Sequence, residues 1–266
     1  MNTTNKRCLV TGASGGIGGE IAKALDAEGY SVILQGRNHE KLLRLQASMS
    51  NRTDIVLGDL NEQSQREQVL EKAFAKGPIE LLINAAGISS FKAFEQASSQ
   101  EISNIFQTNL LSPVLFTQAF LAYVKANSEA SNVCATIVNV GSAFGYIGYP
   151  GFSNYCASKF GLRGFTEALA REYSDSNVKF IYFAPRATQT EINSQSVDDM
   201  NLALGNKVDS AQHVAQALIQ MLKKHKRESV VGWPEKLFAR VNAVAPGVVD
   251  NAIKSKLSTI KRYLHA

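Results

Sequence analysis

Short apolar runs alternate along this chain with longer stretches whose apolar residues recur at helical spacing. The apolar runs predict strands at 7–11, 31–35, 54–57, 81–84, 136–140, 179–183 and 229–233. The amphipathic stretches predict helices at 39–48, 62–75, 101–123, 155–173 and 209–222, and another in which Ile17, Ile21, Ala24 and Leu25 share a face. Strands separated by helices of this length indicate βαβ units. The predicted fold is therefore α/β, a doubly wound sheet of about seven parallel strands with helices on both faces.

The pattern changes after the last predicted strand. We expect residues 1–234 to form one domain and residues 235–266 to be a helical extension of it. A short helix is predicted at 236–244, ending before Pro246-Gly247, and a second carries Ile253, Leu257, Ile260 and Leu264 on one face. Such a helix can dock on the body of the protein, cover a pocket or lie on an anionic membrane surface, and docking is the commoner fate.

Composition and charge narrow the class of protein. Of 266 residues, 45% are hydrophobic and 19% charged, as in a globular protein with a sizeable core. The net charge of +5 is concentrated at the end, where residues 223–266 hold ten Lys/Arg against three Asp/Glu. No nucleic-acid recognition motif accompanies this charge, so we expect no nucleic-acid partner.

The cysteine count and the first residues bear on the cell compartment. Three cysteines without metal-ligand spacing predict reduced thiols and no metal site. The polar start of the chain lacks a signal-peptide pattern, which predicts a cytoplasmic protein, with membrane association possible through the tail.

A glycine-rich turn follows the first predicted strand, with the sequence TGASGGIG at 11–18. At the first βα turn, glycines let the backbone approach a pyrophosphate, and the helix N-terminus supplies free N–H groups. Glycines that merely punctuate a turn are the simpler alternative, and the spacing differs from GxGxxG. The residues expected to contact a dinucleotide here are Gly12, Ser14, Gly16, Ile17 and Gly18.

The end of the second predicted strand bears on which dinucleotide is bound. A site for an unphosphorylated ribose usually has a carboxylate here, but this chain has Gly36 followed by Arg37 and Asn38. A guanidinium suits a 2′-phosphate in charge and geometry, so NADPH/NADP⁺ is favoured over NADH/NAD⁺. A solvated surface arginine is the alternative explanation.

Three residues suggest acid/base chemistry beside this loop. Tyr155 and Lys159 are four residues apart and share a helix face, and Ser142 follows the strand predicted at 136–140. A nearby ammonium is expected to lower the pKa of a tyrosine toward the range of general acid/base catalysis. Ser142 is placed to bind a substrate oxygen. Each residue alone has a structural explanation, but their joint placement predicts a catalytic site.

In these motifs the chain resembles the short-chain dehydrogenase/reductase family, in its main single-domain, Rossmann-like branch. The resemblance extends from Thr11 to about Thr190. It implies that Asp59-Leu60 lies near the adenine and that the strand end Asn84-Ala85-Ala86-Gly87 lines the cofactor. It further implies that Asn109 holds a water that relays protons to Lys159, and that Lys159 binds the nicotinamide ribose. The implied catalytic set is Asn109, Ser142, Tyr155 and Lys159.

The chain departs from the family pattern after the strand predicted at 179–183. Pro185, Thr188 and Thr190 fit a segment that contacts the nicotinamide carboxamide, but Arg186 stands where the family has glycine. Arg186 either pairs with an anionic group of cofactor or substrate, or forms an outward surface ion pair.

The remaining expectations concern the substrate and the assembly. Residues 189–207 should form a flexible flap over the substrate, and Phe144, Tyr149 and Phe152 make the expected pocket apolar, although they could be core or interface residues. The leading hypothesis is NADPH-dependent reduction of a hydrophobic ketone, aldehyde or 3-oxoacyl group. The alternatives are an NAD-linked alcohol dehydrogenase and a non-catalytic dinucleotide sensor. The resemblance also implies a homodimer or homotetramer assembled through helices around 101–123 and 155–173.

Overall fold

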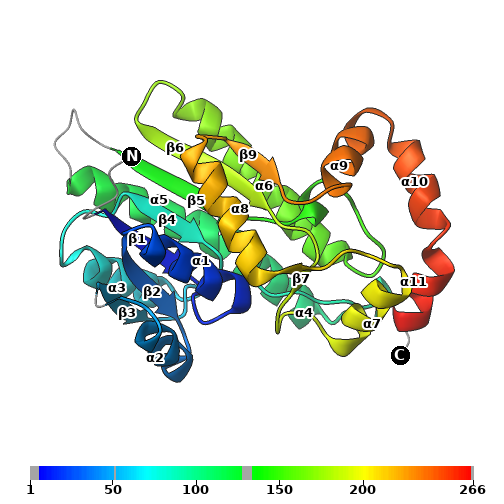
Figure 1. Cartoon of the computed structure of the whole chain (residues 1–266), viewed down its shortest axis with the longest axis horizontal. Helices are drawn as coiled ribbons and strands as arrows, with labels where there is room; N and C mark the ends of the chain where they lie inside the picture. The colour runs from blue at the N-terminus through cyan, green and yellow to red at the C-terminus, as the bar shows by residue number, and fades with distance from the viewer. Residues whose placement is uncertain (1–5, 51, 128–133, 265–266) are drawn as a thin grey trace.

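The computed structural model describes residues 6–50, 52–127 and 134–264. Within these residues the central sheet is parallel and has seven strands in the order β3-β2-β1-β4-β5-β6-β9 (Figure 1). The strands are β1 (Arg7–Thr11), β2 (Ser31–Gly36), β3 (Thr53–Leu57), β4 (Leu81–Asn84), β5 (Ala135–Val140), β6 (Val178–Ala184) and β9 (Glu228–Val230). The predicted doubly wound α/β fold is confirmed. The last strand ends three residues earlier than predicted, so Trp233 lies beyond it.

Helices cover both faces of the sheet, and each face has its own apolar core. On one face α1 (Gly16–Ala27), α2 (His39–Ala47) and α8 (Ala211–Lys223) pack on the strands through residues such as Ile21, Leu42 and Leu218. On the other face lie α3 (Gln63–Phe74), α5 (Ser112–Ala126) and α6 (Ser153–Glu172), with Phe116 and Phe120 fully buried. Because both faces are covered, most residues of the central strands are apolar and buried, without the alternation of a half-exposed sheet.

The helix predicted at 101–123 is interrupted. It consists of α4 (Ser99–Phe106), a π-helical turn at Gln107–Leu111 and α5, with Asn109 buried in the turn. Single π turns inside α-helices occur frequently at functional sites. Among the described residues, Ser99–Ala126 is also the one helical stretch that is long and apolar enough to span a membrane. Length and composition alone are weak evidence of a membrane span, because buried core helices of other proteins pass the same test.

The chain after β6 forms a small end region. Thr188–Gln189 (β7) pairs with Asp209–Ser210 (β8), and the segment between them contains α7 (Gln195–Ala203). The extension folds into α9 (Glu235–Val244), α10 (Pro246–Lys254) and α11 (Leu257–Leu264), of which α11 lies beside α7 in Figure 1. The predicted end before Pro246 is confirmed, but the last amphipathic stretch is two helices, since α10 stops at Lys254 and α11 starts at Leu257.

Candidate active site

The glycine-rich turn forms one wall of a cavity of about 310 Å³ at the carboxyl ends of β1, β2 and β4. Gly12 has a φ of +65°, and a Cβ at this position would lie 2.6 Å from the Cα of Ala86. Gly16 packs against Thr190. Gly15 is the N-cap of α1, and no side chain of the described residues hydrogen-bonds the N-terminal end of this helix. The first N–H groups of α1 are thereby left facing the cavity, as an anion site requires. All five residues predicted from this turn line the cavity.

Arg37 and Asp59 lie at the edge of the same cavity and pair with each other. The Nη1 of Arg37 is 3.2 Å from Oδ2 of Asp59, and 68% of the Arg37 side chain is exposed. Asn38, predicted to bind cofactor, instead uses its side chain to accept from the Lys41 N–H and cap α2. The sequence alone does not distinguish an Asn that caps a helix from an Asn that binds the cofactor at this position.

The end of β4 contributes backbone to the cavity. Ala85, Ala86 and Gly87 line it, but Asn84 does not, because its side chain lies inside the protein and donates to Thr117 and Asn139. The register pairs Asn84 with Asn139 on adjacent strands, which places the two amides side by side. Asn84 therefore joins β4, β5 and α5, a correction to its predicted cofactor contact. Leu60 lines the cavity too, and its carbonyl accepts from Arg66 and Ser112.

The segment after β6 lies between this cavity and a second one. Pro185 and Thr188 line the second cavity, and Thr190 lines both. The Thr188 hydroxyl donates to the Arg186 carbonyl at 2.8 Å, whereas the buried Thr190 hydroxyl has no hydrogen-bond partner in the described chain. Buried polar atoms of folded proteins almost always have a hydrogen-bond partner, and a bound ligand would supply the one that this hydroxyl lacks. With the glycine wall, this orphaned hydroxyl shows that the residues fit a dinucleotide.

Tyr155, Lys159 and Ser142 meet where the two cavities join. Tyr155 lines both cavities, and its hydroxyl and that of Ser142 form a hydrogen bond. The Lys159 Nζ lies 5.6 Å from the centre of the Tyr155 ring and donates to the Val140 carbonyl at 3.1 Å. The i,i+4 spacing on α6 does bring Tyr155 and Lys159 to one face.

The pKa values of these groups reflect burial. Burial raises the pKa of Tyr155 to about 12, although the hydrogen bond with Ser142 opposes the rise. Burial lowers the pKa of Lys159 to about 8. The expectation of a lowered tyrosine pKa is therefore wrong for the protein's own groups, because desolvation of the phenolate outweighs the opposing effect of Ser142.

Asn109 reaches the site from the π turn. Its side-chain oxygen accepts from the Ile88 N–H at 2.8 Å, and its amide donates to the Ile88 carbonyl and to Ser158. Gly87 lies between Asn109 and Lys159, since a Cβ there would be 3.2 Å from the Asn109 oxygen and 3.7 Å from the Lys159 amine. Asn109 thus holds the loop after β4 beside Lys159, while its role in holding a water stays a prediction.

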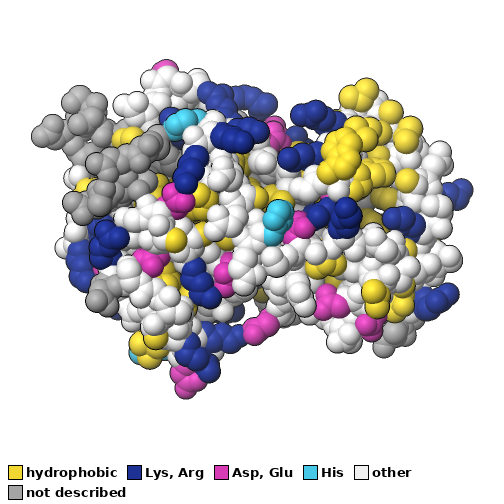
Figure 2. All heavy atoms as spheres, viewed as in Figure 1, with side chains coloured by type: hydrophobic (Ala, Val, Ile, Leu, Met, Phe, Trp, Pro, Cys, Tyr) yellow, Lys and Arg dark blue, Asp and Glu magenta, His cyan; other side chains and the backbone are white. Residues whose placement is uncertain are grey.

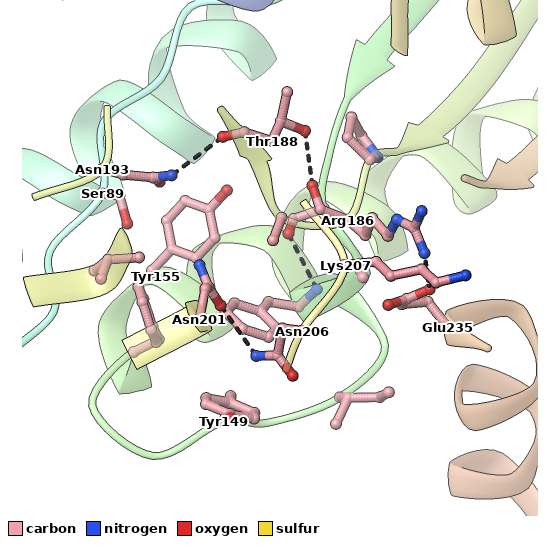
Figure 3. Close-up of a pocket in the computed structure, with 18 of the residues that line it drawn as sticks. Ser89, Tyr149, Tyr155, Arg186, Thr188, Asn193, Asn201, Asn206, Lys207 and Glu235 are labelled. Atoms are coloured by element: carbon pink, nitrogen blue, oxygen red, sulfur yellow. Dashed lines mark hydrogen bonds and ion pairs between the residues drawn. The ribbon is translucent and has the colours of Figure 1, made fainter. Parts of the chain in front are cut away.

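The second cavity, of about 330 Å³, opens beyond Tyr155 and Ser142 (Figure 3). Its walls include Phe144, Tyr149 and Phe152, the aromatics expected from the sequence, and Phe144 stacks on Tyr149. The segment 189–207, expected over the substrate, does line the cavity, through Val197, Met200 and Asn201 of α7 among others. The sequence analysis named no lining residue in the tail, which adds Phe238 from α9, Val249, Ala252 and Ile253 from α10, and Lys256 just after α10. The helical spacing of Val249, Ala252 and Ile253 was a signal available in the sequence.

The tail therefore covers the pocket and docks on the body. Ile260 is fully buried, and Tyr263 and Leu264 join an apolar cluster with Phe91, Phe152 and Met200. The face of α11 that could have met a membrane is turned inward.

Arg186 is held by two carboxylates. Its guanidinium lies 2.7 Å from Asp209 and 3.1 Å from Glu235, and only 11% of the side chain is exposed. In Figure 3 it extends away from Tyr155 toward Glu235 at the start of α9. The ion-pair alternative is the one this geometry supports, but the pair is internal and joins the segment after β6 to the tail.

The chain belongs to the short-chain dehydrogenase/reductase family: the family model described as short chain dehydrogenase matches residues 6–201. It is an oxidoreductase that acts on CH–OH groups with NAD(P). It is 31% identical over 231 residues to an acetoacetyl-CoA reductase of Acinetobacter sp. (strain RA3849), covering 83% of this chain and 91% of that one. It is 29% identical over 224 residues to the 3-oxoacyl-[acyl-carrier-protein] reductase FabG of Escherichia coli (strain K12), covering 82% and 90%.

Solved structures share the fold. A short chain dehydrogenase/reductase from Burkholderia phymatum in complex with NAD superposes with a TM-score of 0.81 at 21% identity, covering 93% of this chain and 96% of that one. Actinorhodin polyketide ketoreductase with NADPH gives 0.74 at 24% identity, covering 85% and 95%. Both kinds of nicotinamide dinucleotide occur among these neighbours.

Proposed function

We propose that this protein reduces a hydrophobic ketone, aldehyde or 3-oxoacyl-type carbonyl to the alcohol, with NADPH as hydride donor and Tyr155 as general acid. The observation that carries the proposal is the position of Tyr155, which lines both the glycine-walled cavity and the apolar one. A phenol at this junction meets a substrate carbonyl from one side and the cofactor from the other.

The proton chemistry follows from the groups around Tyr155. A pKa of about 12 keeps the phenol protonated at neutral pH, so it can donate to the carbonyl oxygen as negative charge develops there. Ser142 would donate a second hydrogen bond to the same oxygen. Lys159, with a pKa of about 8, carries its proton at neutral pH and stabilises the phenolate that forms. The bound cofactor supplies the hydride.

The preference for NADPH rests on the end of β2. Gly36 leaves no carboxylate to bind an unphosphorylated ribose, and the exposed Arg37 guanidinium can turn from Asp59 toward a 2′-phosphate. The proposed substrate class rests on the apolar and aromatic walls of the second cavity, and on relatives named for reduction of acetoacetyl-CoA and 3-oxoacyl carrier protein.

A homo-oligomer is part of the proposal. Three large apolar side chains are exposed on the two helical stretches expected at the interface: Leu111, Leu115 and Phe160. Exposed apolar side chains on neighbouring helices are typical of subunit contacts.

The experiment that tests the proposal begins with fluorescence titration of the protein by NADPH and NADH, for wild type and Arg37→Glu. Tighter binding of NADPH that the variant loses supports Arg37 as the phosphate-binding residue. Equal or tighter NADH binding overturns it and favours NAD-linked alcohol oxidation. Reduction of acetoacetyl-CoA or a hydrophobic ketone is then followed at 340 nm. Tight dinucleotide binding without turnover of any carbonyl or alcohol offered would favour a sensor.

A further inference from the structure

Large apolar side chains gather on the surface of the tail, over α9 and the turn into α10. The exposed fractions are 65% for Trp233, 45% for Leu237, 36% for Phe238, 87% for Val244 and 58% for Val248. We call these five residues the α9–α10 patch. Figure 2 shows the yellow side chains of this region with dark blue Lys and Arg around them. Large contiguous apolar patches on a protein surface often mark interaction sites.

The orientation of α9 accounts for the exposure. Its inward face is fixed by the buried Ala239, by Asn242 donating to the Tyr146 carbonyl at 2.8 Å, and by Glu235 pairing with Arg186. These anchors turn Leu237 and Val244 to solvent. The whole turn 243–248, Ala-Val-Ala-Pro-Gly-Val, is exposed and lacks polar side chains.

The rim of the patch is basic. Lys236 and Arg240 on α9 and Lys254 on α10 are exposed and form no ion pair within the described part of the chain. Asp250 is the nearby exposed acid on α10, while Glu235 is committed to Arg186. An apolar tip with a basic rim matches the interface of a bilayer that contains anionic lipid.

The positive charge of the rim distinguishes between two candidate partners, a second copy of this chain and an anionic lipid surface. A second copy of the chain would bring the same basic rim against this one, and like charges facing one another are unfavourable. An anionic lipid surface offers opposite charge to Lys236 and Arg240 and an apolar layer to Val244 and Val248. Trp233 fits the same place, because tryptophan favours the level of the lipid headgroups.

We propose that the α9–α10 patch docks this protein on anionic membrane surfaces, with the turn 243–248 entering the headgroup region. The patch adjoins the substrate cavity, since Phe238 belongs to both and Val249 and Ile253 on α10 line the cavity. If the proposed reductase function holds, a membrane-dissolved acyl or ketone substrate enters beside Phe238. The docking itself does not depend on that function.

Trp233 provides the test, because it is the single tryptophan in the chain. Its emission is recorded as vesicles of equal parts phosphatidylcholine and phosphatidylglycerol are added, and again with phosphatidylcholine alone. The expected result is a blue shift with the anionic vesicles that high salt reverses, and quenching by brominated acyl chains. No blue shift with the anionic vesicles would overturn the proposal.

Two sets of variants separate the contributions. Val244→Asp/Val248→Asp should reduce the vesicle partition coefficient about tenfold or more, while Leu43→Asp, an exposed apolar position on α2, leaves it unchanged. Lys236→Glu/Arg240→Glu should reduce it by at least about tenfold, while Lys72→Glu/Lys125→Glu, with the same change in net charge, has a much smaller effect. Equal binding by each variant and its control would contradict docking through this patch.

A lipid-free measurement tests the competing occupant. Emission from Trp233 that is already blue-shifted, and that shifts to the red on dilution, would mean that a second copy covers the patch. This outcome would also overturn the proposal. Dinucleotide titration of Val244→Asp/Val248→Asp, which lie outside both cavities, shows that a loss of vesicle binding is not a loss of folding.

Discussion

The two cavities that meet at Tyr155 are built in opposite ways. The cofactor cavity is lined largely by short segments directly after β1, β2, β3 and β4, which are rich in glycine. The substrate cavity is lined by side chains from four distant segments: the loop after β5, the segment after β6, α7 and the tail helices. The first is formed mainly by βα turns, whereas the second takes part of its wall from the docked tail.

This contrast explains how one fold serves many substrates. The parallel sheet fixes the cofactor cavity, because the register of β1, β4 and β5 places their carboxyl ends together. The tail and flap are attached at one end of the sheet, through the Arg186 ion pairs and the apolar cluster around Ile260. If the two regions are independent, a change in one should leave ligand binding in the other unaltered.

The largest effect is expected where the cavities join. Tyr155→Phe should lower kcat about 10²- to 10⁴-fold, because it removes the proton donor, and should leave the Kd for NADPH within about twofold. Tyr149→Phe, in the wall of the substrate cavity, is the matched control and should keep most of the activity. Full activity in Tyr155→Phe would end the proposed mechanism.

A backbone change should damage only the cofactor cavity. Gly12→Ala is expected to weaken NADPH binding by about tenfold or more, because a positive φ costs an L-residue about 1–2 kcal/mol and the new Cβ would overlap Ala86. Gly164→Ala, whose Cβ would meet nothing within 4 Å, should leave binding unchanged. Titration by nicotinamide fluorescence measures both, and equal affinities would show that this turn does not hold the dinucleotide.

The burial of Lys159 should make the free energy of unfolding depend on pH. Its pKa is lowered from 10.5 to about 8, so the folded protein loses this proton before the unfolded chain does. The cost of burying the ammonium is full below pH 8, and the free energy of unfolding should rise between about pH 8 and 10.5 as the folded lysine becomes neutral.

The variant Lys159→Met isolates this effect. It should be more stable than wild type by roughly 3 kcal/mol below pH 8, with the difference shrinking toward pH 10.5. Urea unfolding of both proteins at several pH values measures it. A difference that does not change with pH would contradict the lowered pKa.

The smallest effect on turnover is expected from the ion pair that holds the tail. Arg186→Met should raise KM for the carbonyl substrate several-fold, because Glu235 and α9 are released, and should leave the Kd for NADPH within about twofold. Stability should fall by about 2 kcal/mol, since two partly buried carboxylates lose their partner. Lys76→Met, which breaks an exposed pair with Asp54, should cost at most about 1 kcal/mol. Unchanged KM in Arg186→Met would show that the pair does not position the tail.

The sequence by itself determined the alternation of strands and helices, the glycine turn and the helix face shared by Tyr155 and Lys159. Each of these depends on local geometry: strand and helix periods, the positive φ at Gly12 and the i,i+4 spacing. The approximate bounds of the seven strands follow from the same local signals.

Only the tertiary structure decided what the isolated side chains do. It turned Asn84 toward Asn139, used Asn38 to cap α2, paired Arg186 with two carboxylates and raised the pKa of Tyr155. It also brought α10 to the substrate cavity and turned α11 inward, which left the α9–α10 patch exposed. These outcomes depend on which residues meet across the sheet and how much water they keep, and neither is encoded by spacing along the chain.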